Sequence, residues 1–149
     1  MFTQKRLTAM DSFCVAGPRL RFKRVNGVVE RCVVGYTGGV KPNPTYHAIG
    51  DHTEAVLIEY NPDIVTFEDL LLEWSQMHSP TRYRSTQYRS AIWYTNNEEK
   101  ETAQNFVVAM KSAQRGYAFF ISIEPATRFY RAEEYHEDFL SKRNNVNWV

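Results

Sequence analysis

The stretch from Gly35 to Glu54 limits what this chain can fold into more than any other part of the sequence. It reads GYTGGVKPNPTYHAIGDHTE, and its content of Gly, Pro and Asn excludes a regular helix or strand. Strand-like runs flank it at 28–36 and 55–60. Loops of this length inside compact domains are usually functional or disordered, and disordered segments are poor in aromatic residues. The tyrosines and histidines of this stretch therefore favour an ordered, functional loop.

Strand and helix patterns alternate along the rest of the chain, which predicts an α/β sandwich of two or three layers. A capping box of Thr66 and Asp69 predicts a helix start, and Asn96 is expected to cap a second helix. Apolar residues follow each start at helical spacing. Further strands are expected at 5–10, 91–94 and 119–123, and further helices from Pro18 and at 132–139.

Bulk properties exclude several classes of protein. A length of 149 residues predicts a single domain over residues 1–149, large enough to bury a core without disulfides. A formal net charge of +1 argues against binding to nucleic acid or to an acidic membrane surface. No apolar run reaches the length of a membrane span, and the N-terminus lacks the apolar core of a secretory signal, so we expect a cytoplasmic protein.

Cys14 is the strongest candidate for a nucleophile. It precedes the helix expected from Pro18, and unpaired N–H groups at a helix N-terminus favour the thiolate. A small buried apolar residue is the alternative interpretation, and it is the stronger one for Cys32, which lies within a strand-like run.

Glu54 lies where the polar loop meets an apolar strand, and burial there would raise its pKa and make it a proton donor. Tyr46 and Tyr88 are candidate hydrogen-bond donors to a developing oxyanion. Ordinary surface exposure of the carboxyl group and ordinary aromatic packing are the alternatives. The histidines show no metal-ligand spacing, so no metal site is expected.

Several motifs resemble the A-type peptide methionine sulfoxide reductases. The segments GYTGG at 35–39, NPTY at 43–46, HTE at 52–54 and TQYRSAI at 86–92 occur in the order of that family, and the resemblance spans about 14–140. It implies an α/β sandwich around a mixed sheet, with no bound cofactor. It also implies that Cys14 is the nucleophile, that Glu54 protonates the sulfoxide oxygen, and that two tyrosines, Tyr46 and Tyr88, bind this oxygen.

The implied substrate is methionine sulfoxide in peptides, or a small sulfoxide. Attack by the Cys14 thiolate would leave a sulfenic acid on the enzyme. Many members of the family carry resolving cysteines near the C-terminus, and no cysteine follows Cys32 in this sequence. An external thiol, from glutathione or a thioredoxin-type protein, is therefore the expected reductant.

The family has Gly-Cys-Phe-Trp-Gly at the nucleophile, whereas this chain has Phe13-Cys14-Val15-Ala16-Gly17. We expect Val15, Ala16, Arg19 and His52 to contact the substrate. The small pair Val15 and Ala16 predicts weak reduction of simple methionine sulfoxide and room for a bulkier group, and Arg19 would favour an anionic one.

Two alternatives follow from this altered segment. A gapped alignment would place Ser12 at the nucleophile's position. The chain could also be a descendant without reductase activity, acting as a binding or assembly protein or as an acid–base enzyme in the same pocket.

Overall fold

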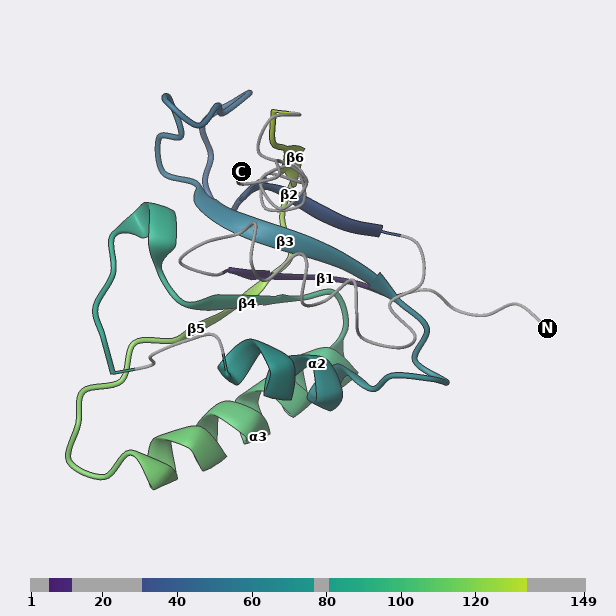
Figure 1. Cartoon of the computed structure of the whole chain (residues 1–149), viewed down its shortest axis with the longest axis vertical. Coiled ribbons are helices and arrows are strands. Elements are labelled where there is room, and N and C mark those ends of the chain that lie inside the picture. Colours follow the sequence, from purple (N-terminus) through teal and green to yellow (C-terminus); the bar gives the residue numbers. More distant parts are fainter. Residues whose placement is uncertain (1–5, 12–30, 77–80, 134–149) are drawn as a thin grey trace, which may run out of the picture.

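A computed structural model describes residues 6–11, 31–76 and 81–133 of the chain. Its centre is a six-stranded sheet with the strand order β5-β4-β1-β3-β2-β6 (Figure 1). The strands are β1 (Arg6–Asp11), β2 (Arg31–Thr37), β3 (Thr53–Tyr60), β4 (Ala91–Tyr94), β5 (Ser122–Pro125) and β6 (Tyr130–Arg131).

The sheet is mixed in direction. β4 and β5 run parallel, while the pairs of β1 with β3 and β4, and of β2 with β3 and β6, are antiparallel. The register of β2 and β3 places Tyr36 opposite Glu54 and Thr37 opposite Thr53, so the two ends of the loop at 38–52 lie next to each other. The predicted mixed sheet is therefore confirmed.

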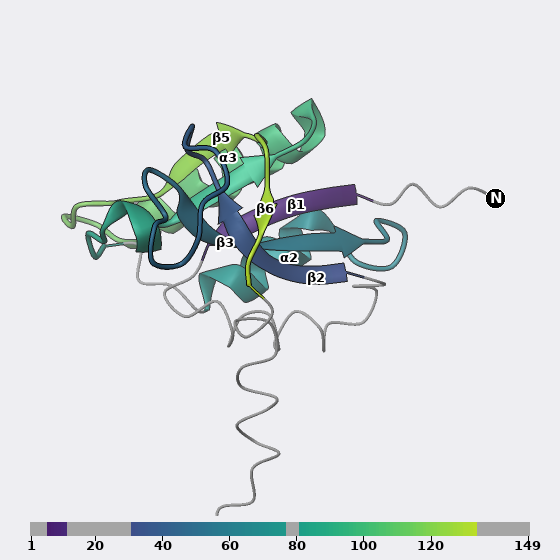
Figure 2. The ribbon, with the colours of Figure 1, turned by 90° about the horizontal axis from the view of Figure 1, so that it is seen from above.

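Two helices, α2 (Phe67–Ser75) and α3 (Asn97–Ala113), form a layer on one face of the sheet. In the view from above, α2 lies behind β2 and β3, and α3 lies behind β5 (Figure 2). Alternate residues of β2 and β3 meet the apolar side of α2 in one core cluster. This cluster includes Val34, Val56, Ile58, Phe67, Leu70, Leu71 and Trp74. The architecture confirms the predicted α/β sandwich.

Both helix starts agree with the sequence. The Thr66 hydroxyl accepts a hydrogen bond from the Asp69 N–H at 3.1 Å, and the Asp69 carboxylate accepts one from the Thr66 N–H at 3.0 Å. The Asn96 side chain accepts from the Glu99 N–H at 2.8 Å. The Glu99 carboxylate itself is buried and accepts bonds from the Tyr60 hydroxyl and from Thr95, which ties α3 to the sheet.

The main differences from the sequence-based prediction concern the last strands. β5 begins at Ser122, although a strand was expected from Phe119, and β6 was not expected at all. Only two residues of β6 pair, and Gly35 permits their approach because an added Cβ would lie 2.3 Å from the Tyr130 carbonyl oxygen. The helix expected from Pro18 lies outside the described residues, and most of the helix expected at 132–139 does too. The domain extent of 1–149 stays a prediction.

Replacing Trp74 with Ala is expected to lower the free energy of unfolding by about 3–5 kcal/mol, because the whole side chain is buried between α2 and the sheet. Leu72 provides a matched control on the same helix, since its side chain is 52% exposed. Leu72→Ala should change the free energy of unfolding by about 0.5 kcal/mol or less. Urea denaturation followed by circular dichroism measures both, and equal losses would contradict the packing described.

Candidate active site

The loop at 38–52 is held together by its own polar groups. The Asp51 carboxylate accepts hydrogen bonds from the N–H groups of Val40 at 2.8 Å and Lys41 at 3.1 Å, and these bonds hold the pKa of Asp51 below its ordinary value. Gly39 allows this closure, since a Cβ there would lie 2.4 Å from an Asp51 carboxylate oxygen. The bonds agree with the expectation of an ordered loop.

His52 closes the same loop from inside. Its Nδ1 accepts from the Gly39 N–H at 3.2 Å, so its Nε2 carries the hydrogen and donates to the Lys41 carbonyl oxygen at 2.7 Å. The side chain is only 1% exposed. Substrate binding by His52 stays a prediction, and this geometry gives the imidazole a role in holding the loop.

Glu54, Tyr46 and Tyr88 are brought together by Gln87. The Gln87 side-chain amide donates to a Glu54 carboxyl oxygen at 2.7 Å and to the Tyr88 hydroxyl oxygen at 3.1 Å. The hydroxyl oxygens of Tyr46 and Tyr88 lie 3.4 Å apart. Glu54 comes from β3, Tyr46 from the loop, and the other two from the short 3-10 helix η1 (Thr86–Tyr88). Three of the four predicted catalytic side chains therefore form one cluster.

Glu133 adds a second carboxylate to this cluster. It accepts from the Tyr36 hydroxyl at 2.5 Å and from the Tyr46 N–H at 3.0 Å. Tyr36 lies on β2, opposite Glu54, and is almost completely buried. Glu133 therefore links the strand next to Glu54 with the part of the loop that carries Tyr46.

The pKa of Glu54 is raised above its ordinary value. Burial is the main cause, because it disfavours the charged form, and the negative charge of Glu133 adds to it. The hydrogen bond from Gln87 acts in the opposite direction, since it favours the carboxylate. The net effect favours a protonated Glu54, which can donate a proton to a bound group.

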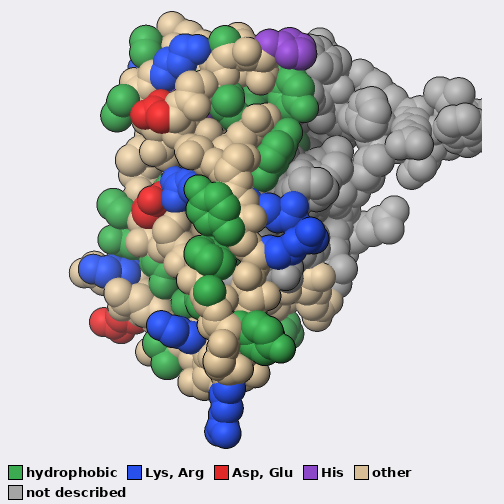
Figure 3. Space-filling model, turned by 90° about the vertical axis from the view of Figure 1, so that its left-hand side faces the viewer, with side chains coloured by type: hydrophobic (Ala, Val, Ile, Leu, Met, Phe, Trp, Pro, Cys, Tyr) green, Lys and Arg blue, Asp and Glu red, His purple; other side chains and the backbone are tan. Residues whose placement is uncertain are grey.

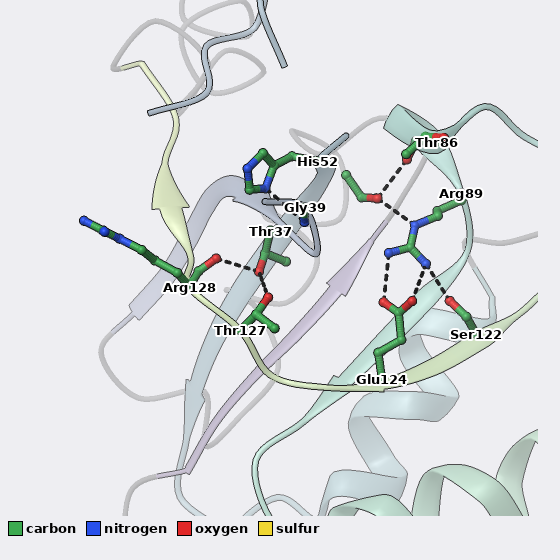
Figure 4. A network of polar contacts seen from close by, with 10 residues as sticks. Thr37, Gly39, His52, Thr86, Arg89, Ser122, Glu124, Thr127 and Arg128 are labelled. Carbon is green, nitrogen blue, oxygen red and sulfur yellow. Dashed lines mark hydrogen bonds and ion pairs between the residues drawn. The ribbon is translucent and has the colours of Figure 1, made fainter. Parts of the chain in front are cut away.

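A second polar network anchors η1 to the sheet (Figure 4). The Thr53 hydroxyl donates to the Thr86 carbonyl oxygen at 2.8 Å and accepts from Arg89 Nε at 2.8 Å. The Arg89 guanidinium also forms a bidentate pair with Glu124, at 2.8 and 3.0 Å, and donates to Ser122. A bidentate pair fixes orientation as well as distance, so this network holds η1, and with it Gln87 and Tyr88, beside Glu54.

Gln87, Glu133 and Tyr36 also belong to this cluster, and the sequence analysis assigned them no role. Tyr36 could have been found from the strand pattern, because alternate residues of neighbouring strands share a face. Tyr36 and Gln87 lie within the motifs at 35–39 and 86–92, and Glu133 lies within the span of about 14–140 that carries the family resemblance. The predicted residues Cys14, Val15, Ala16 and Arg19 lie outside the described residues, and so does Ser12.

Within the described ranges, no group of three or more His, Cys, Asp or Glu side chains is arranged to hold a metal ion. In the same ranges, no helix has the length and apolar character needed to cross a membrane.

A buried carboxyl group with a raised pKa lies next to an amide and two phenols on an α/β sandwich, and such a group of side chains is suited to acid–base chemistry. Comparison with known proteins identifies the family of the chain. Residues 9–148 match the family model for peptide methionine sulfoxide reductase. The chain belongs to the peptide methionine sulfoxide reductase family.

Individual relatives and solved structures are consistent with this family. The chain is 36% identical over 141 residues to the peptide methionine sulfoxide reductase MsrA of Acidobacterium capsulatum, covering 87% of this chain and 90% of that protein. Its fold is similar to methionine sulfoxide reductase A of Corynebacterium diphtheriae, with a TM-score of 0.80, 30% identity, and coverage of 97% and 77% of the two chains. Reduced Mxr1 from Saccharomyces cerevisiae gives a TM-score of 0.81 and 27% identity, with coverage of 95% and 87%.

Glu133→Gln is expected to lower the pKa of Glu54, because it removes the neighbouring negative charge while an amide oxygen can still accept from the Tyr46 N–H. Carbon-detected NMR titration of the Glu54 carboxyl group measures this without any activity assay. Tyr36→Phe is the control, since it removes a hydrogen bond to Glu133 and leaves both carboxyl groups in place. An unchanged Glu54 pKa in Glu133→Gln would contradict the charge effect.

Proposed function

We propose that this protein reduces methionine-S-sulfoxide, in peptides or as a related small sulfoxide, with Cys14 as the nucleophile. The observation that carries the proposal is the cluster of Glu54, Tyr46 and Tyr88, joined through Gln87. Membership of the peptide methionine sulfoxide reductase family supports the reaction.

The Cys14 thiolate attacks the sulfoxide sulfur, and Glu54 gives its proton to the sulfoxide oxygen. The S–O bond of the substrate breaks as the oxygen passes to Cys14, so methionine is released and the cysteine is oxidised to a sulfenic acid. Tyr46 and Tyr88 donate hydrogen bonds to the oxygen as its negative charge develops. Glu54 serves as the acid because its raised pKa favours the protonated carboxyl group, which can donate the proton.

Gln87 and Glu133 act as positioning residues in this proposal. Gln87 holds Glu54 and Tyr88 at hydrogen-bond distance from one amide group, and Glu133 holds the backbone of Tyr46. An acid and two oxygen ligands fixed around one S=O group avoid much of the entropy cost of bringing them together during the reaction.

An external thiol completes the cycle. Two equivalents of thiol reduce the Cys14 sulfenic acid, which gives water, a disulfide of the reductant and the free Cys14 thiol. Cys32 is a poor candidate for this step, because it is 5% exposed and packs in the core cluster with Val34 and Ile58. We assign the reductant to a thioredoxin-type protein or glutathione.

A dithiothreitol-coupled assay on both epimers of methionine sulfoxide tests the proposed activity. Activity is expected on the S epimer, to be abolished in Cys14→Ser and to fall by about 10²–10⁴-fold in Glu54→Gln, which cannot donate the acidic proton. In the unmodified protein the rate should decline as pH rises through the raised pKa of Glu54, since the carboxylate has no proton to give.

Two outcomes of this assay would favour other hypotheses about the function. Full activity in Cys14→Ser would move the nucleophile elsewhere, with Ser12→Ala as the next variant. No activity on either epimer, with a reactive Cys14 thiol, would favour a descendant that has lost the reaction. If the double variant Val15→Phe and Ala16→Trp then restores activity, the small side chains of Val15 and Ala16 are the cause of the loss.

A single turnover without reductant is expected to leave Cys14 as a sulfenic acid that dimedone labels, because Cys32 is held inside the sheet core. Peptide mapping by mass spectrometry identifies the product. Cys32→Ser is the matched control and should give the same yield of labelled Cys14. A Cys14–Cys32 disulfide as the main product would show that the two thiols meet.

A further inference from the structure

A cavity of about 260 Å³ lies next to η1, between the segments 82–84 and 119–122. Its walls include two exposed aromatic side chains, Tyr83 and Phe120, which are 77% and 40% exposed. Their rings meet edge to face with centroids 5.6 Å apart. Exposed aromatic side chains that gather around a cavity are a sign of a binding surface.

The lining of this cavity is basic. Arg82, Arg84 and Arg89 contribute to it, and none of the described residues that line it is Asp or Glu. Glu124, which is not part of the lining, pairs with Arg89. Figure 3 shows basic, hydrophobic and some acidic side chains on the face that carries the loops at the left of Figure 1. The lining is therefore complementary to a ligand that is anionic and partly apolar.

The cavity is close in the chain to the proposed active site. Arg89 directly follows Tyr88, and Arg84 precedes Tyr88 by four residues, a step that spans at most about 14 Å. An extended peptide covers that distance in about four residues. The bond of Arg89 to Thr53, the residue before Glu54, holds this lining in a fixed place relative to the cluster.

We propose that this cavity, named here the arginine pocket, binds an acidic side chain of an oxidised polypeptide substrate a few residues from its methionine sulfoxide. The aromatic pair contacts the apolar part of that side chain, and the arginines attract its carboxylate. The proposal rests on the proposed reductase function and adds to it a preference among peptide substrates.

Peptides with one methionine sulfoxide and with Glu, Gln or Lys four residues away on either side test the arginine pocket. At low salt, the kcat/KM of the unmodified protein should be about 1.5- to fivefold higher for the Glu peptide than for the Lys peptide, as expected for exposed charge pairs. The preference should shrink at 0.5 M salt because the charges are screened. Equal values at low salt would overturn the proposal.

The double variant Arg82→Glu and Arg84→Glu should reverse the preference and leave the kcat/KM for N-acetylmethionine sulfoxide unchanged. The double variant Lys111→Glu and Arg128→Glu changes the net charge equally at residues outside the lining, and it should keep the preference. A reversal in this second variant as well would assign the preference to net charge and overturn the pocket.

A binding measurement separates this inference from the proposed function. Fluorescence anisotropy of the labelled peptides on Cys14→Ser should show the same order of affinities, whether or not the chain turns the sulfoxide over. Inorganic phosphate at millimolar concentration and constant ionic strength should leave that order unchanged. Loss of the preference in phosphate would identify a phosphate site and overturn the assignment to an acidic side chain.

Discussion

The antiparallel pairing of β2 with β3 is the constraint on which the rest of the site depends. It sets Glu54 opposite Tyr36 and brings the two ends of the loop at 38–52 together. The pairing of β6 with β2 then brings the chain to Glu133, next to Tyr36. A slip of one residue would turn Glu54 to the opposite face of the sheet, because side chains alternate along a strand. The acid would then lose Gln87 and Glu133 together.

Two buried glutamates show how one residue type serves opposite purposes in this fold. Glu99 accepts three hydrogen bonds, from Tyr60 and twice from Thr95, and so ties α3 to the strands. Glu54 lies beside another carboxylate, and this charge together with burial raises its pKa. Burial is the main cause of the shift in Glu54, since burial and a like charge both favour the protonated form of a carboxyl group. The first arrangement stabilises the fold, and the second favours the protonated carboxyl group that the proposed reaction requires.

The short helix η1 connects the proposed chemistry with the proposed selection of substrates. On one side, Gln87 and Tyr88 contact the cluster around Glu54. On the other side, Arg89 reaches Thr53, Ser122 and Glu124 and forms part of the arginine pocket. Because such a short helix has little stability of its own, its position comes from these side-chain bonds. A peptide that fills the arginine pocket would therefore lie against the same anchored segment that carries Tyr88, one of the two proposed ligands of the sulfoxide oxygen.

The sequence by itself determined the helices α2 and α3 and the strand at 91–94, and it named Glu54, Tyr46 and Tyr88 as candidate site residues, because helical spacing, capping residues and family motifs are local signals. Tertiary structure decided what depends on contacts between distant segments. β6 exists through its pairing with Gly35 and Tyr36, and residues 119–121 line a cavity although their apolar pattern predicted a strand. The pKa of Glu54 is raised mainly by burial, and the charge of Glu133, which lies 79 positions further along the chain, adds to this effect. The position of Glu54 between a polar loop and an apolar strand predicted its burial, whereas the nearby charge of Glu133 arises only in the folded molecule, because the two residues are far apart in the chain.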